Sequence, residues 1–279
     1  VALFGITSYN FIAGGTGSGN VNKAYTIDML QGLQAAGYEV NDELKNVYET
    51  YTTYERARQT AARAARGGMM GGLMLGEAAL SEMPLERAII NKQVGLNDVA
   101  IITIGRNAGE GADRHIEGDF NLTTVERQLL QDVTDAFHEA GKQVIVVLNI
   151  GGVIETASWK GMPDAILLAW QPGQEGGYSV ADILSGKANP SGKLTSTFPI
   201  NYMDVPSSKN FPYNVESDGM MGMGAAMGGQ QRETKNVSYT NYEEGIWVGY
   251  RYFATAGKAF TYPFGYGLSY TTFSYGTPP

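Results

Sequence analysis

The sequence contains no cysteine and only two histidines among its 279 residues. Without thiols the chain has no disulfide bond, no cysteine zinc site and no thiol nucleophile, although an absent residue does not assign a compartment. No apolar run approaches the roughly 18 residues that a membrane-spanning helix requires. The formal net charge of -8 disfavours nucleic acid, because phosphate binding needs concentrated lysine and arginine. We therefore expect neither membrane nor nucleic acid as a partner, and the localisation stays open.

The sequence has enough apolar material for a full core, since 43% of its residues are hydrophobic and 17% are charged. A length of 279 residues is long for one domain and short for two. The opening VALFGI has the pattern of a strand without a polar lead-in, and the closing TTFSYGTPP resembles the first strand of a further unit. We expect one large domain with an extension, and chain ends that are cut edges.

Short aliphatic runs alternate with helical patterns along the first two thirds of the sequence. The runs predict strands buried on both faces of a parallel sheet, at Val1–Ile6, Val99–Ile104, Val144–Leu148 and Ala165–Ala169. Strands that alternate with helices predict a doubly wound α/β sheet. In such sheets, ligands meet the loops that follow the carboxyl ends of the strands.

Helices are predicted at Tyr25–Ala36 and Thr123–Ala140, each followed by a glycine that can terminate it. Thr123 and Glu126 fit a capping box at the start of the second helix. The polar segment Asn41–Arg66 predicts an exposed helix. Two stretches rich in glycine and methionine, at 67–76 and 219–229, predict irregular loops.

A glycine-rich motif, GGTGSGNVN at Gly14–Asn22, lies between the first strand and the first helix. Glycines there allow a sharp turn and a close approach to a ligand, and Glu39 lies at a suitable distance to bind a ribose, so nucleotide binding is one interpretation. The motif lacks the Gly-Lys-Ser/Thr ending of a phosphate loop, and a dinucleotide fingerprint would need glycine in place of Asn20. A tight turn without a ligand is the alternative.

A charged loop, GRNAGEGADRHIEGDFNL at Gly105–Leu122, follows the strand Val99–Ile104. Charged loops are more often solvated surface than functional sites. Glu110, however, lies between Gly109 and Gly111, so its backbone can take unusual dihedral angles and its carboxyl group can project from the rim. If shielded from water, this carboxyl group would have a raised pKa and could donate a proton to a leaving group.

Taken in order, the motifs resemble glycoside hydrolase family 3 enzymes of the β-glucosidase type. The resemblance covers nearly the whole chain and rests on GGTGSG, GRNAGEGADR, VIVVLNIGGVIETASW, LLAWQPGQEGGYSVADILSGKANPSGKLTSTFP, YEEGIWVGYRYF and FGYGLSYTTF. It implies an α/β sandwich domain with a mostly parallel six-stranded sheet flanked by helices in residues 1–200. Residues 201–279 would then form a long loop and a C-terminal surface extension. The family's catalytic barrel and its fibronectin III-like domain would be absent from this chain.

The resemblance also implies roles for individual residues. Glu110 corresponds to the family's catalytic acid/base, and Ser18 corresponds to a serine that binds a sugar hydroxyl. Asp113 and Arg114 are interpreted as residues that support the loop. The aromatic residues between Tyr242 and Tyr252 predict packing between domains, with an outer sugar subsite as the alternative.

We expect Arg114 to pair with a nearby carboxylate, either Asp119 or Glu117. Neither His115 nor His138 shows the spacing of a metal ligand, so no metal site is predicted. No cofactor is expected either.

For this family the resemblance implies a retaining double displacement, in which an aspartate on the barrel attacks the anomeric carbon. Glu110 would protonate the departing oxygen and later activate water. The sequence has no Ser-Asp-Trp context for the aspartate, and a barrel of roughly 250 residues does not fit beside the sandwich.

The sequence therefore predicts an exo-acting β-glycosidase domain that is inactive alone. Its partners would be a β-linked glucoside or oligosaccharide and a family 3 barrel domain, in cis or in trans. A non-catalytic carbohydrate-binding or interaction module of the same fold is the alternative, and a nucleotide-binding α/β protein is a third hypothesis.

Overall fold

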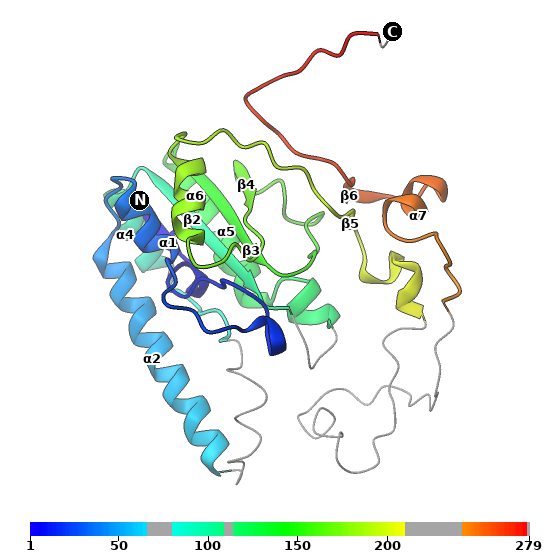
Figure 1. Ribbon diagram of the computed structural model, residues 1–279. Coiled ribbons are helices and arrows are strands. Elements are labelled where there is room, and N and C mark those ends of the chain that lie inside the picture. Colours follow the sequence, from blue (N-terminus) through cyan, green and yellow to red (C-terminus); the bar gives the residue numbers. More distant parts are fainter. Residues whose placement is uncertain (66–79, 109–113, 210–241, 278–279) are drawn as a thin grey trace.

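A computed structural model of the chain describes residues 1–65, 80–108, 114–209 and 242–277. Its centre is a parallel sheet with the strand order β1-β2-β3-β4. The strands are β1 (Ala2–Phe4), β2 (Val99–Arg106), β3 (Gln143–Ile150) and β4 (Ala165–Leu168). These are the four predicted strands, and Figure 1 shows helices on both sides of the sheet.

Helices occupy most of the connections between the strands. The longest connection, from β1 to β2, holds α1 (Met29–Ala35), α2 (Asp42–Ala65) and α4 (Arg87–Leu96). Helix α5 (Thr124–Glu139) joins β2 to β3, and α6 (Gly176–Leu184) follows β4. Short helical turns complete the pattern: η1 (Ile6–Ser8), η2 (Gly17–Gly19), η3 (Ile116–Phe120), η4 (Tyr202–Asp204) and η5 (Pro206–Lys209).

The predicted helices are present, with two differences. Helix α1 begins four residues later than predicted, because the Asp28 side chain accepts a hydrogen bond from Gln31 N while the Gln31 side chain accepts one from Asp28 N. Helix α2 is less exposed than predicted, since Leu44 and Tyr48 are fully buried. The capping box of α5 is confirmed. The loops predicted at 67–76 and 219–229 lie outside the described residues.

The α/β class and the parallel sheet flanked by helices are confirmed, but the described part of the sheet differs from the six strands that the resemblance implied. In the described part of the chain it has four strands. Two further strands, β5 (Phe198–Pro199) and β6 (Phe260–Tyr262), form a separate antiparallel pair. Pro199 lacks the N–H that a central strand needs, so β5 suits an edge pairing outside the main sheet.

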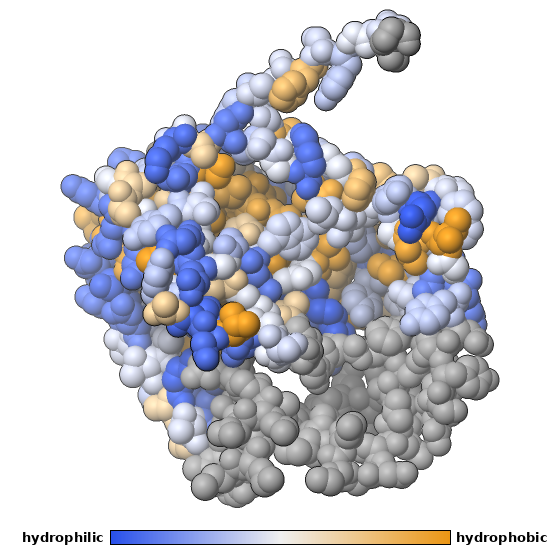
Figure 2. All heavy atoms as spheres, in the orientation of Figure 1, coloured by the Kyte–Doolittle hydropathy of each residue, from blue (hydrophilic) through white to orange (hydrophobic). Residues whose placement is uncertain are grey.

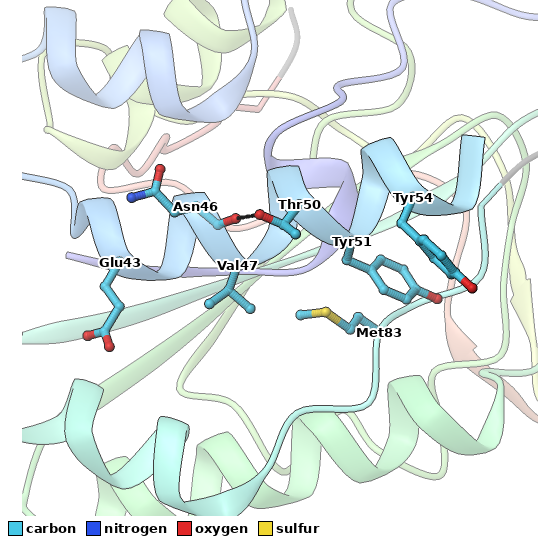
Figure 3. A pocket seen from close by; sticks show the side chains of 7 residues that line it. All are labelled: Glu43, Asn46, Val47, Thr50, Tyr51, Tyr54 and Met83. Atoms are coloured by element: carbon cyan, nitrogen blue, oxygen red, sulfur yellow. Dashed lines mark hydrogen bonds between the residues drawn. The ribbon is translucent and has the colours of Figure 1, made fainter. Parts of the chain in front are cut away.

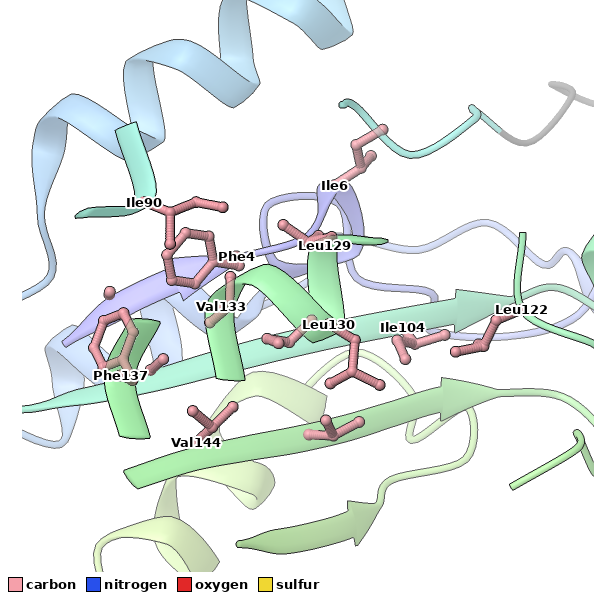
Figure 4. Close-up of a cluster of buried hydrophobic side chains, with 14 of the residues drawn as sticks. Phe4, Ile6, Ile90, Ile104, Leu122, Leu129, Leu130, Val133, Phe137 and Val144 are labelled. Carbon is pink, nitrogen blue, oxygen red and sulfur yellow. The ribbon is translucent and has the colours of Figure 1, made fainter. Parts of the chain in front are cut away.

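Side chains of the strands alternate between two cores, one on each face of the sheet. On β2, Ile102 and Ile104 pack with Phe4 of β1 against α2, α4 and α5. Figure 4 shows this cluster, in which Phe137 of α5 meets the ring of Phe4 edge-on at a centroid distance of 6.2 Å. Ile101 points to the other face, toward α1 and α6. The sheet is therefore covered on both sides, as a parallel sheet requires.

Helices α1 and α6 touch backbone to backbone through two glycines. A Cβ placed on Gly32 would lie 2.1 Å from Gly177 O, and a Cβ on Gly177 would lie 2.0 Å from Asp28 O. Gly177 N also donates a hydrogen bond to Ile27 O at 3.0 Å. This contact draws the segment that enters α1 against the start of α6.

The last described helix is α7 (Tyr250–Thr255), followed by β6 and an extended segment that Figure 1 shows leading away from the sheet. The division at residue 200 between a sandwich domain and an extension stays a prediction. Among the helices of the described ranges, none is long and apolar enough to cross a membrane.

Candidate active site

The carboxyl ends of the four parallel strands lie at one edge of the sheet, where the predicted site should be. The chain leaves β1 at Gly5, whose φ of +91° and closeness to Thr103 O exclude a larger residue. Ile6 N then donates to Glu82 Oε2 at 3.0 Å, while Met83 N donates to Glu82 Oε1 at 3.0 Å. Burial raises the pKa of Glu82 to about 7, although these two hydrogen bonds oppose the shift.

The loop after β1 and the loop after β2 are in direct contact. Thr16 N donates a hydrogen bond to Ala108 O at 3.1 Å, and a Cβ on Gly15 would lie 2.4 Å from that same oxygen. Glycine at position 15 is therefore needed for the approach. Ser18 follows two residues later, exposed on η2, and Ala108 comes two residues before Glu110 in the sequence.

Glu110 and Asp113 themselves lie outside the described residues, and Arg114 is the first described residue after them. Arg114 Nε donates to both carboxylate oxygens of Asp119, at 2.8 and 2.7 Å. Arg114 Nη1 donates to Val153 O at 3.3 Å, in the loop after β3. The predicted pairing of Arg114 with Asp119 is thus confirmed.

A buried arginine that the sequence analysis missed lies at the start of the same loop. Arg106 Nε donates to Asp119 O at 2.9 Å, and Nη1 donates to Gly105 O at 2.7 Å. Its Nη1 and Nη2 also donate to the two carboxylate oxygens of Glu126. The Glu126 carboxylate in turn caps α5 by accepting from Thr123 N at 2.8 Å. The available sequence signal was an arginine two residues after the predicted strand Val99–Ile104.

A second missed residue is Asn149, which is fully buried near the end of β3. The sequence signal was an amide within the aliphatic run QVIVVLNI. Most buried polar side chains are hydrogen-bonded, and Asn149 is bonded through both its Oδ1 and its Nδ2.

No cluster of histidine and acidic side chains suited to a metal occurs among the described residues. His115 is exposed on the charged loop. His138 lies near the amino edge of the sheet, where its Nε2 is 3.0 Å from Asp164 Oδ2. The hydrogen bond from Val144 N lowers the pKa of Asp164, and the contact with His138 adds to this effect. This pair is structural and lies away from the loops described above.

An open groove runs along α2, and Figure 3 shows the side chains that line it: Glu43, Asn46, Val47, Thr50, Tyr51, Tyr54 and Met83. Its carboxylate is already paired, because Lys92 Nζ lies 2.7 Å from Glu43 Oε1. None of the lining residues belongs to the loops after β2, β3 or β4. The groove is therefore separate from the candidate site.

Residues 1–270 match the family model described as the glycosyl hydrolase family 3 C-terminal domain. The chain belongs to this family. The resemblance found in the sequence is thereby confirmed for almost the whole length of this family 3 domain.

Relatives of this family 3 domain are several times longer than it. β-Glucosidase A of Butyrivibrio fibrisolvens is 35% identical over 98% of this chain and 32% of its own length. The structure of β-glucosidase 3B from Thermotoga neapolitana in complex with glucose has 42% identity and a TM-score of 0.79, over 97% of this chain and 34% of that one. An exo-α-(1→6)-L-arabinopyranosidase of Bifidobacterium longum is 34% identical over 63% of this chain and 20% of its own length. The chain spans about a third of the first two relatives.

Proposed function

We propose that this family 3 domain supplies the general acid/base and a sugar-binding residue to a retaining β-glycosidase site. Glu110 is the acid/base, and Ser18 binds a sugar hydroxyl. The observation that carries the proposal is the hydrogen bond from Thr16 N to Ala108 O. It joins the two loops on which Ser18 and Glu110 lie, at the edge of the sheet where α/β proteins bind ligands.

The chemistry requires a second carboxylate. Glu110 protonates the glycosidic oxygen while the nucleophile attacks the anomeric carbon, and it then removes a proton from the water that releases the sugar. A retaining mechanism places the two carboxyl groups about 5 to 5.5 Å apart. We propose that the nucleophile belongs to a family 3 barrel domain, in cis or in trans, and that this chain alone is inactive. Asp113 and Arg114 support the loop of Glu110.

The β-glucosidase relatives support a β-linked glucoside or oligosaccharide as the substrate. The arabinopyranosidase relative indicates that a related domain also serves an enzyme named for a different sugar. We infer that this domain contributes the proton transfer, and that the choice of sugar depends largely on the partner domain.

Exposed apolar side chains around α7 support the proposal that another domain docks on this chain. Large apolar side chains between Ile246 and Phe264 are exposed around α7, and Figure 2 shows apolar atoms in that region of the molecule. Ile246 is 68% exposed and Trp247 is 48% exposed. Large apolar side chains that are exposed close together in the sequence are typical of interfaces. We propose that the partner domain covers it.

The test compares Glu110→Ala with the unchanged enzyme, with the chain joined to its nucleophile domain. Turnover of a disaccharide should fall by roughly 100- to 10,000-fold, because an alkoxide leaving group needs a proton. A dinitrophenyl glucoside should be affected far less, since its phenolate leaves without help. Added azide should restore turnover and give a product with retained β configuration.

Equal losses on both substrates without azide rescue would contradict the role of Glu110 and would favour a non-catalytic carbohydrate-binding module. The division between two domains has its own test, which is hydrolysis of an aryl β-glucoside by the purified chain. If the chain alone is active and Glu110→Ala abolishes that activity, no second domain is needed.

A further inference from the structure

Asn149 joins three of the four loops at the candidate site. Its Oδ1 accepts a hydrogen bond from Ile12 N at 2.6 Å. Its Nδ2 donates to Ile12 O at 3.0 Å and to Trp170 O at 2.6 Å. Ile12 lies in the loop after β1, Asn149 lies near the end of β3 and Trp170 follows β4. A single buried amide therefore connects the ends of β1, β3 and β4.

The contact with Trp170 coincides with backbone strain. Trp170 has a φ of +51°, and among the described residues it is the one non-glycine in the left-handed region. Such a conformation persists only where its surroundings enforce it. The Asn149 hydrogen bond and the packing of the Trp170 ring against Phe198, at a centroid distance of 6.3 Å, provide that constraint. Nearby, Gly173 N donates to Ala13 O at 2.9 Å, which ties the same two loops again.

The loops after β1 and β4, which Asn149 connects, each form a hydrogen bond with the loop after β2. Thr16 N donates to Ala108 O at 3.1 Å, from the loop after β1. Gln171 Nε2 donates to Asn107 Oδ1 at 3.1 Å, from the loop after β4. Asn107 and Ala108 thus receive one hydrogen bond from each side. They are the last described residues before Glu110.

We propose that Asn149 is a positioning residue for the acid/base loop, acting through Thr16 and Gln171. The proposal rests on the function assigned to Glu110 above. Asn149 is fully buried, so its side chain is not accessible to a bound substrate. An amide suits this position because one acceptor and two donors are needed there, and an aliphatic residue would leave the partly buried N–H and C=O groups of Ile12 without these partners.

The first test is Asn149→Asp, which keeps the shape of the side chain and replaces the donor Nδ2 by an acceptor. In the enzyme with both domains, kcat/KM should fall by about 10- to 100-fold, because a displacement near 1 Å is that costly. The loss should lie mainly in kcat and be larger for a disaccharide than for a dinitrophenyl glucoside. Asn97→Asp is the matched control, since Asn97 is also buried and its Nδ2 donates to Gln93 O at 2.9 Å at the opposite edge of the sheet.

Asn97→Asp should leave kcat/KM unchanged at a temperature where both variants are folded. A double variant then separates positioning from stability. If Asn149 acts through Glu110, Asn149→Asp combined with Glu110→Ala should be no slower than Glu110→Ala alone. The proposal would be overturned if the losses in kcat/KM of the two single variants multiplied in the double variant. It would also be overturned if Asn97→Asp lost as much activity as Asn149→Asp.

Two further measurements keep the proposal testable if Asn149→Asp folds poorly or Glu110 has another role. Gln171→Ala removes one of the two connections at a less buried position and should show a smaller loss, again absent in the Glu110→Ala background. Hydrogen exchange in the same enzyme should be faster at Thr16 N in Asn149→Asp than in Asn97→Asp. If the exchange rate at Thr16 N is unchanged, Asn149 does not position this loop. If exchange is faster but Glu110→Ala affects good and poor leaving groups equally, only the proposed function of Glu110 is refuted.

Discussion

Arg106 and Glu126 form a bidentate ion pair, with Nη1 2.5 Å from Oε1 and Nη2 2.6 Å from Oε2. The side chains are only 9% and 10% exposed. Arg106 is the last residue of β2, and Glu126 lies in the first turn of α5. The segment between them contains Glu110, so the loop of the proposed acid/base begins and ends at one buried ion pair.

Removing the arginine should therefore destabilise the fold strongly. Arg106→Met leaves the Glu126 carboxylate buried without its partner, and we expect the free energy of unfolding to fall by about 3 to 5 kcal/mol. Lys92→Met is the control, because Lys92 pairs with Glu43 at the surface, where the two side chains are 58% and 45% exposed, and such pairs contribute about 1 kcal/mol or less. Urea unfolding of the two variants provides the measurement. Similar small losses would show that the buried pair contributes little.

The partly buried carboxyl group of Glu82 should make stability depend on pH. Burial raises its pKa from the usual 4.5 to about 7. Between these values the folded chain binds a proton that the unfolded chain does not, so stability is greatest below the lower value and falls as pH rises through 7. The change should be on the order of 1 to 3 kcal/mol.

Glu82→Gln cannot ionise and should flatten this dependence, whereas Glu86→Gln, at an exposed position, should retain it. Urea unfolding between pH 4 and pH 8 tests the difference. Parallel curves for the unchanged chain and Glu82→Gln would contradict it. Glutamine also loses one of the hydrogen bonds that the Glu82 carboxylate accepts. This loss is the same at every pH, so it does not affect the slope of unfolding free energy against pH.

Replacing a helical glycine by alanine should have opposite effects inside and outside the contact between α1 and α6. Gly32→Ala should lower the free energy of unfolding by about 1 to 3 kcal/mol, since the added Cβ would meet the backbone of Gly177. Gly95→Ala, in α4, should raise it by about 0.5 to 1 kcal/mol, because its Cβ would meet nothing within 4 Å and alanine favours the helix. Thermal or urea unfolding would measure both. A stabilising Gly32→Ala would show that the helices can separate without cost.

The sequence predicted those elements whose determinants are local. The box formed by Thr123 and Glu126 and the glycine after Ala140 place α5 within one residue at each end. The start of α1 was placed too early because its cap depends on reciprocal side-chain bonds of Asp28 and Gln31, which a pattern of apolar residues does not show. The aliphatic runs predicted the four strands that the described part of the sheet contains, whereas the six strands came from the family resemblance alone.

For the candidate site, the alternation of strands and helices predicted that the loops of Ser18 and Glu110 lie at one edge of the sheet. It did not show which residues hold those loops. Asn149 contacts Ile12 across a separation of 137 residues, and Arg106 contacts Glu126 across 20. Neither contact has a periodic or local signal.

The exposed residues around α7 should make the isolated chain self-associate. Burial of apolar surface against a second copy would take the place of the partner domain proposed above. Replacing Ile246 and Trp247 by serine should return the chain to a monomer in light scattering. Leu96→Ser is the control, because Leu96 is 59% exposed on α4. If the unchanged chain is monomeric at high concentration, this surface does not drive association.

The register of β1 has a consequence for the order in which the domain is built. Ala2 pairs with Ala100, so β1 waits for a partner that is synthesised nearly a hundred residues later, whereas Val99 of β2 pairs with the nearer Gln143. Closing the longer loop has the greater entropic cost, so β2, α5 and β3 should assemble first and β1 should join the edge of a preformed sheet. On the ribosome, the strands that carry the charged loop would therefore be in place before the N-terminal strand docks and brings the glycine-rich loop against them.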